Sequence, residues 1–296
     1  MSTFIHLGYP KTGTTFLQKE VFPRQESVNL LGKPFKSKEF RQIVYKITTL
    51  DEPSFKREVD HFTARLATIV SDEKPNLLTV EGFLQATRYQ HPGGTDFRRI
   101  FSRLQAIFST FGDVRFFFVI RNHTDALCAS YNQFRQYWDG YGYSKAVLLD
   151  HLAGKRNDLP FVLDNFKYHE ILSLLYEVAP PAHVAMFFYE DLKRDNLRFA
   201  EDIFRFIGCA FDREKFRAEG KVVRATRDMK PGFLQRIVQE FQHLARSKNK
   251  YLPIEFFRRR EGLIKAYYAE DLGRFEGGSI KAKFREYGYL DPVDAG

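Results

Sequence analysis

The sequence has only two cysteines and no long apolar run. Cys128 and Cys209 lie in apolar surroundings without the spacing of metal ligands, which predicts buried, non-catalytic thiols in a reducing compartment. The sequence contains no stretch of eighteen apolar residues, so it predicts no membrane span. The chain starts with a strand pattern, where a secretory signal needs a basic segment followed by an apolar one. Together these absences predict a soluble cytoplasmic protein.

Internal repeats, low-complexity linkers and a clear domain boundary are also missing. The chain has 296 residues, of which 44% are hydrophobic, and its 31 Phe and 15 Tyr are enough to fill a large core. This composition excludes a disordered chain. We therefore expect a single domain over residues 1–296, with a helical C-terminal part from about residue 220.

The charge is strongly positive but spread along the chain. The formal net charge is +9 and the pI is about 9.4, which favours anionic partners. A nucleic-acid-binding stripe and a solvated basic surface both fit this excess. No nucleic-acid motif accompanies the charge, so we expect the basic surface and no nucleic-acid partner.

Short apolar runs alternate with longer helical patterns. Because buried parallel strands read as continuous apolar runs, this alternation predicts an α/β fold of three layers, with a central parallel sheet flanked by helices. The expected strands are residues 3–7, 77–80, 114–120 and 183–189, and the expected helices are residues 15–21, 54–70, 96–110, 124–137, 165–178 and 196–207.

The first loop has the glycine frame of a phosphate-binding loop but lacks its usual lysine. It lies in the stretch HLGYPKTGTTFLQ, residues 6–18, between an expected strand and an expected helix. The spacing from Gly8 to Gly13 fits GxxxxGK[ST], yet Thr14 stands at the lysine position and the positive charge lies earlier, at Lys11. The first N–H groups of such a helix have no backbone acceptor and attract phosphate.

The displaced lysine argues against a kinase, which normally needs magnesium held by a carboxylate. No expected strand ends in a clear magnesium ligand, since one leads to Glu81 and another to Arg121. A sulfuryl group carries one negative charge fewer than a phosphoryl group. A lysine and helix N–H groups can therefore offset its charge without a metal.

The motif YPKTGTT, residues 9–15, resembles the 5′-phosphosulfate loop of bacterial-type sulfotransferases that use 3′-phosphoadenosine 5′-phosphosulfate (PAPS). The resemblance implies a P-loop-like fold, PAPS as the donor, adenosine 3′,5′-bisphosphate (PAP) as the product and no required metal. The donor-binding residues that it implies in this loop are Lys11, Thr12, Gly13, Thr14 and Thr15.

A second segment, FFFVIRNHTDALCASYNQF at residues 116–134, resembles the 3′-phosphate segment of the same family. The resemblance implies that Arg121 grips the 3′-phosphate with its planar, permanently charged fork. The family serine falls on Ala129, and Ser130 follows one place later, about 100° further round a helix. Either an irregular helix start lets Ser130 reach the phosphate, or Arg121 and backbone groups bind it without a hydroxyl.

A third segment, VAMFFYEDLKRDNLRFAEDIFRFIGC at residues 184–209, is similar to a strand, turn and helix of the family, and we expect it to be structural. The family's late nucleotide segment has no clear counterpart. KVVRATRD, residues 221–228, falls in the expected place, which makes Arg224 or Arg227 a candidate nucleotide contact, and a solvated basic turn is the alternative that we favour.

Transfer to a hydroxyl also needs a base. The resemblance implies a histidine in small-molecule sulfotransferases and a strand-end glutamate in many carbohydrate sulfotransferases, and Glu81 in NLLTVEGF occupies such an end. A structural salt bridge is the alternative role for Glu81. His91 is the reserve base, whereas His6 within the first strand fits a core histidine and His123 stands at a frequent proline position of the motif.

These inferences combine into one expected function. The chain is expected to transfer a sulfuryl group from PAPS to a hydroxyl of a carbohydrate or glycolipid, with Glu81 as base and Lys11 stabilising the leaving phosphate. The basic charge suits an anionic acceptor and also suits PAPS itself. The alternatives are a P-loop kinase for a small molecule and a non-catalytic module that binds nucleotide or nucleic acid.

Overall fold

The computed structural model describes most of the chain, and the described part falls into two compact units. Unit 1 takes in residues 1–121 and 168–219, and unit 2 takes in residues 122–167 and 220–296. The single domain expected from the sequence stays a prediction. The described residues are 2–9, 11–32, 35, 38–81, 83–84, 96–140, 144–155, 161–164, 166–218 and 251–291.

Unit 1 is built on a parallel sheet of five strands in the order β2-β3-β1-β4-β5. The central strands β1 and β4 are buried over most of their length, as expected for a parallel sheet covered on both faces. β1 lies between β3 and β4, so its end has a neighbouring strand end on each side. The strands are β1 (Ser2–Gly8), β2 (Asn29–Leu30), β3 (Asn76–Glu81), β4 (Asp113–Ile120) and β5 (Val184–Phe188).

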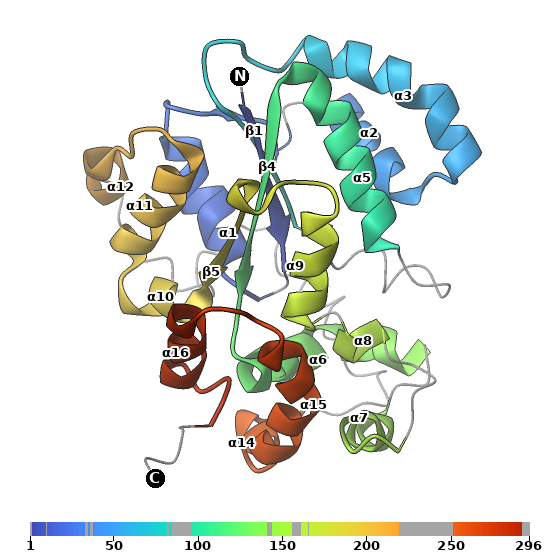
Figure 1. Ribbon diagram of the computed structural model, residues 1–296, viewed down its shortest axis with the longest axis vertical. Coiled ribbons are helices and arrows are strands. Elements are labelled where there is room, and N and C mark those ends of the chain that lie inside the picture. Colours follow the sequence, from blue (N-terminus) through green and yellow to red (C-terminus); the bar gives the residue numbers. More distant parts are fainter. Residues whose placement is uncertain are drawn as a thin grey trace, which may run out of the picture. The chain divides into compact units, whose positions relative to one another are not determined.

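One face of the sheet packs against the segment that follows β1 and against a late helix, as Figure 1 shows. Alternate residues of the strands, such as Phe4, Leu77 and Phe117, meet the apolar side of that late helix, α11. The helix is strongly amphipathic, with apolar residues at the spacing of one helical face. The helical segments on this side are α1 (Thr14–Phe16), the π-helix η1 (Leu17–Val21), the 3₁₀ turn η2 (Phe22–Arg24), α10 (Tyr189–Arg194), α11 (Asn196–Ile207) and α12 (Arg213–Ala218).

The opposite face is covered by α5 and α9, which contact each other and the strands β4 and β5 (Figure 1). The rings of Phe101 on α5 and Phe116 on β4 lie 6.3 Å apart. α2 and α3 pack on α5 and on each other. The elements here are α2 (Lys38–Thr49), α3 (Glu52–Ala67), α5 (Phe97–Phe108), η3 (Ser109–Phe111), α9 (Tyr168–Tyr176) and η4 (Pro181–His183).

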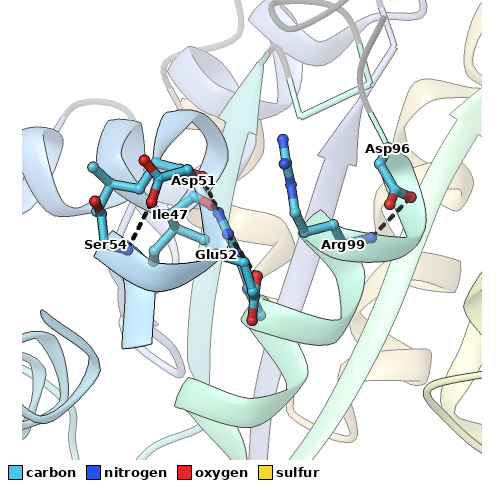
Figure 2. Close-up of polar contacts among 8 residues, drawn as sticks. Ile47, Asp51, Glu52, Ser54, Asp96 and Arg99 are labelled. Atoms are coloured by element: carbon cyan, nitrogen blue, oxygen red, sulfur yellow. Dashed lines mark hydrogen bonds and ion pairs between the residues drawn. The ribbon is translucent and has the colours of Figure 1, made fainter. Parts of the chain in front are cut away.

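A buried arginine ties α5 to the turn between α2 and α3. Arg103 donates to the carbonyls of Ile47 and Leu50, at 3.0 and 2.8 Å, and pairs with Glu52 at 2.8 Å. The carbonyls at a helix C-terminus have no partner within the helix, so this cation satisfies them. Figure 2 shows this region, including the Asp51 carboxylate that caps α3 by accepting from the N–H of Ser54.

Unit 2 is helical in its described residues. α6 contacts α14 and α15, and α15 also contacts α7. Asn122 caps α6 by accepting from the N–H of Thr124 at 3.0 Å, and its amide donates to the Tyr287 carbonyl. The helices are α6 (His123–Gly140), α7 (Lys145–Leu152), α8 (Phe161–Asp164), α14 (Ile254–Arg258), α15 (Glu261–Gly273) and α16 (Gly278–Glu286).

The expected elements are confirmed in kind and in order. The fold is a three-layer α/β fold with a parallel sheet, and each of the four expected strands agrees with an observed strand to within one residue at either end. All six expected helices are present, with ends that shift by up to three residues. The two-residue strand β2 and the helices α2, α7, α8, α10 and α12 were not among the elements expected from the sequence. In its described residues the C-terminal part is helical, as expected.

Candidate functional site

Three strand ends carry the candidate residues of unit 1 to one edge of the sheet. Gly8 at the end of β1 pairs with Glu81 at the end of β3, and Arg121 follows β4, which pairs with β1 on its other side. The chain leaves β1 toward the β2 side of the sheet and leaves β4 toward β5. This reversal is the topological switch point, where open parallel sheets bind their ligands. Lys11 and Arg121 belong to the two connections that flank it.

The loop after β1 has a backbone that ordinary residues avoid. Lys11 has φ 62° and Gly13 has φ 84°, both in the left-handed region. Thr12 and Thr14 are buried, and their hydroxyls donate to the Tyr9 carbonyl at 3.0 and 3.2 Å. These two hydroxyls therefore hold the loop's own shape. Lys11 and Thr15 are exposed at its surface.

Gly13 is required by its surroundings as well as by its φ. A Cβ at this position would collide with the Leu192 side chain and would lie 3.4 Å from the ring of Tyr189. Both of these residues belong to α10, the turn after β5 that we expected to be structural. Helix α10 therefore packs directly on the loop after β1, and the glycine allows this close approach.

Arg121 links the end of β4 to this loop. Its Nη1 donates to the Lys11 carbonyl at 2.9 Å, and its guanidinium lies 4.7 Å from the centre of the Tyr189 ring. The Tyr168 hydroxyl donates to the Arg121 carbonyl at 2.6 Å, and the Tyr168 ring meets Tyr9 edge-on at 5.4 Å. Both the backbone and the side chain of Arg121 are thus fixed beside the loop.

Behind the loop, a buried polar cluster joins β1, β3 and η1. The Thr79 hydroxyl accepts from Gln18 Nε2 at 3.0 Å and shares a hydrogen bond of 2.9 Å with His6 Nδ1. The His6 ring stacks on Phe117 at 4.9 Å. Burial lowers the pKa of His6 to about 3, so the ring is neutral at physiological pH. His6 is the core histidine expected from the sequence.

His123 is also a structural histidine, in unit 2. Its Nε2 lies 2.9 Å from the Phe166 carbonyl and its ring stacks on Tyr268 at 3.9 Å. Burial lowers its pKa to about 3, although the hydrogen bond with the Phe166 carbonyl acts in the opposite direction. This environment gives His123 no role as a base near neutral pH.

For four predicted site residues, the structure does not test the predicted role. The backbone of Glu81 ends β3, and only this backbone position is described. His91 and Arg224 lie outside the described residues. Ser130, on α6 of unit 2, is fully buried, and its hydroxyl has no hydrogen-bond partner among the residues that the structure describes. Its contact with a phosphate stays a prediction.

The described residues contain neither a cluster of metal-ligating side chains nor a membrane-spanning helix. No group of three or more His, Cys, Asp or Glu side chains in these ranges has an arrangement that would hold a metal ion. Within the same ranges, none of the helices has the length and apolar character needed to span a bilayer.

The family is shown by comparison with known proteins. A family model described as a sulfotransferase domain matches residues 2–230, well over half of the chain. The chain belongs to the sulfotransferase domain family. The resemblance found in the loop and strand motifs is confirmed at the level of the family, and this places the protein among enzymes that transfer sulfuryl groups. Comparison with curated protein sequences gives no match.

Solved structures similar to this sulfotransferase include a bacterial and a mammalian sulfotransferase. The one from Alicyclobacillus acidocaldarius is 13% identical with a TM-score of 0.47, and the match covers 91% of this chain and 96% of that one. A mouse sulfotransferase in complex with PAP is 14% identical with a TM-score of 0.44, over 97% of this chain and 89% of that one. Similarity this low assigns no role to any single residue.

The sequence analysis missed the residues that support the loop. Tyr189, Leu192 and Tyr168 were not expected near it, and the Gln18–Thr79 contact was not foreseen. One signal was available: Tyr189 directly follows a strand, and parallel strand ends meet at one edge of the sheet. Nothing in the sequence pattern indicates that Tyr168 meets Arg121.

Proposed function

We propose that this sulfotransferase transfers a sulfuryl group from PAPS to a hydroxyl of a carbohydrate or glycolipid. One observation carries the proposal: the register of β1 with β3 and β4 brings the positions of Lys11, Glu81 and Arg121 to the same edge of the sheet, at its switch point. Family membership supports sulfuryl transfer over the phosphoryl transfer of a kinase.

Each residue has a role that follows from its chemistry. Glu81 accepts the proton of the acceptor hydroxyl as the oxygen attacks sulfur, and the bond between sulfur and the phosphate oxygen breaks in line. Lys11 stabilises the negative charge that develops on this leaving oxygen. Arg121 binds the 3′-phosphate, together with backbone groups and either with or without Ser130. The products are a sulfate ester and PAP, and no metal takes part.

The remaining residues complete the donor site. Thr12, Gly13, Thr14 and Thr15 supply N–H groups at the start of the helical segment after β1. His91 is the reserve base and Arg224 a nucleotide contact. The net charge of +9 suits an acidic saccharide as the acceptor and suits the donor equally. A cytoplasmic location is part of the same proposal.

Calorimetry with PAP in the absence of magnesium tests this function. We expect tight binding to the wild-type protein and binding about a hundredfold weaker to Lys11→Ala, because a charged contact to the 5′-phosphate is lost. Transfer assays with PAPS should then favour saccharide acceptors over phenols. A preference for ATP with magnesium would support a kinase. Binding to oligonucleotides with an affinity that falls steeply as the salt concentration rises would support a nucleic-acid-binding module.

A further inference from the structure

The strained backbone of Lys11 needs an explanation. A lysine at φ 62° lies in a region that costs free energy for any residue with a Cβ, and such a conformation persists only where its surroundings enforce it. In the part of the chain that the structure describes, the hydroxyls of Thr12 and Thr14 donate to the Tyr9 carbonyl and not to the Lys11 carbonyl. Another group must therefore hold Lys11.

Arg121 is placed to hold it. Its Nη1 is 2.9 Å from the Lys11 carbonyl oxygen, and a guanidinium donor makes a stronger bond to a carbonyl than a neutral amide does. The guanidinium is itself held by the Tyr189 ring, and its backbone by the Tyr168 hydroxyl. The contact also occupies an oxygen that would repel an anion, since a phosphate-binding loop presents N–H groups to its ligand.

A guanidinium has five N–H donors, and the contact with the Lys11 carbonyl is made by one of its nitrogens, Nη1. We infer that Arg121 is a positioning residue for Lys11 in addition to being the 3′-phosphate ligand, and that the loop for the 5′-phosphosulfate depends on Arg121 even when no 3′-phosphate is bound. This inference rests on the proposed function. It means that one arginine shapes both phosphate subsites of the donor.

A comparison of two nucleotides separates this role from simple 3′-phosphate binding. PAP carries both phosphates, whereas adenosine 5′-phosphate (AMP) lacks the 3′-phosphate. If Arg121 served only the 3′-phosphate, Arg121→Met would weaken PAP and leave AMP unchanged. We expect Arg121→Met to weaken AMP about tenfold and PAP by a larger factor, measured by calorimetry. Unchanged AMP affinity in Arg121→Met would overturn the inference, and if the wild-type protein binds no AMP, the conformation of Lys11 in a crystal structure of the variant decides it.

The variants are chosen so that folding and charge are controlled. Methionine keeps the unbranched stem beside Tyr189 and removes every N–H donor of the side chain. Arg121→Lys restores one charged group, so its affinities for AMP and PAP should lie between those of the wild type and those of Arg121→Met. Arg65→Ala, an exposed arginine on α3 that pairs with Glu39, removes the same charge and should leave both affinities unchanged. Thermal melting of each variant checks that the chain folds.

A crystal structure of ligand-free Arg121→Met gives a readout that does not depend on binding. We expect Lys11 to leave the left-handed region once its carbonyl has lost the guanidinium. A φ that stays near 62° would contradict the positioning role even if PAP binding were weakened. If the wild-type protein bound no PAP while Lys11 moved in the variant, the proposed function would fail and the contact between the two residues would stand.

Discussion

The two ends of the β1–β3 strand pair differ in their polar residues and in their backbone conformation. At the amino end, the buried Asn76 accepts from Asn29 Nδ2 at 2.7 Å and from the Ser71 N–H at 2.8 Å, and donates to the Ser71 carbonyl at 3.1 Å. At the carboxyl end stand Lys11 in a strained conformation and the catalytic candidate Glu81. The amino end satisfies its own polar groups, and the carboxyl end carries strain and charge that a ligand would use. Stability and function are thus expected to divide between the two edges.

The largest effect is expected from Glu81→Gln at the carboxyl end. Glutamine has nearly the same shape but cannot accept the acceptor's proton, so kcat should fall by about 100- to 10,000-fold. Affinity for PAP, measured by calorimetry, should not change, because the role proposed for Glu81 concerns the acceptor and not the donor. Full activity in this variant would remove Glu81 as the base, and His91→Ala would then be examined in the same assay.

The counterpart at the amino end is Asn76→Ala. It leaves partly buried groups of Ser71 and Asn29 without their Asn76 bonds, so the free energy of unfolding should fall by about 2 kcal/mol, measured in urea. In the protein that remains folded, kcat and PAP affinity should equal those of the wild type. A loss of kcat comparable to that of Glu81→Gln would show that the two edges do not divide stability and function.

His6, in the middle of β1, should make the free energy of unfolding depend on pH. The pKa of His6 is lowered by burial from 6.5 to about 3, so below pH 6.5 the unfolded chain binds a proton that the folded chain does not. Stability should therefore fall as the pH drops from 6.5 toward 3. Between pH 7.5 and 5.5, His6→Phe should lose about 1.4 kcal/mol less than the wild type in urea unfolding. An equal loss in both proteins would mean that His6 is protonated in the fold.

The smallest effect compares alanine with glycine at each edge. At position 11 the φ of 62° favours glycine, so Lys11→Gly should be about 1 kcal/mol more stable than Lys11→Ala. Asn76 lies within an ordinary strand, where Asn76→Gly should be less stable than Asn76→Ala by about 0.5–1 kcal/mol. Thermal unfolding of the four variants measures both differences. If Lys11→Gly were no more stable than Lys11→Ala, Lys11 would carry no strain.

Sequence patterns predict the parts of this fold that depend on local composition. The strands β1, β3, β4 and β5 are apolar runs buried on a parallel sheet, and their ends agree with the expectation to within one residue. β2 was missed because two residues give no period to detect. The loop motif also located Lys11 and Gly13 correctly at the end of β1.

The contacts within the site depend on strand order and could not be predicted. Arg121 meets Lys11 because β4 lies directly beside β1, and the sequence alone does not state which strands are neighbours. The φ of Lys11 is likewise set by tertiary contacts, since lysine has no local preference for it. The packing of Tyr189 on Gly13 joins two segments that are about 175 residues apart, and no local pattern reports such a meeting.

The central claim is that the loop after β1 and the end of β4 bind the two phosphates of one donor nucleotide. A crystal structure of the protein soaked with PAP tests it most directly. We expect the 5′-phosphate within hydrogen-bond distance of the Lys11 side chain and the N–H groups that follow it, and the 3′-phosphate on the Arg121 guanidinium. Bound PAP with neither phosphate near these two residues would contradict the account.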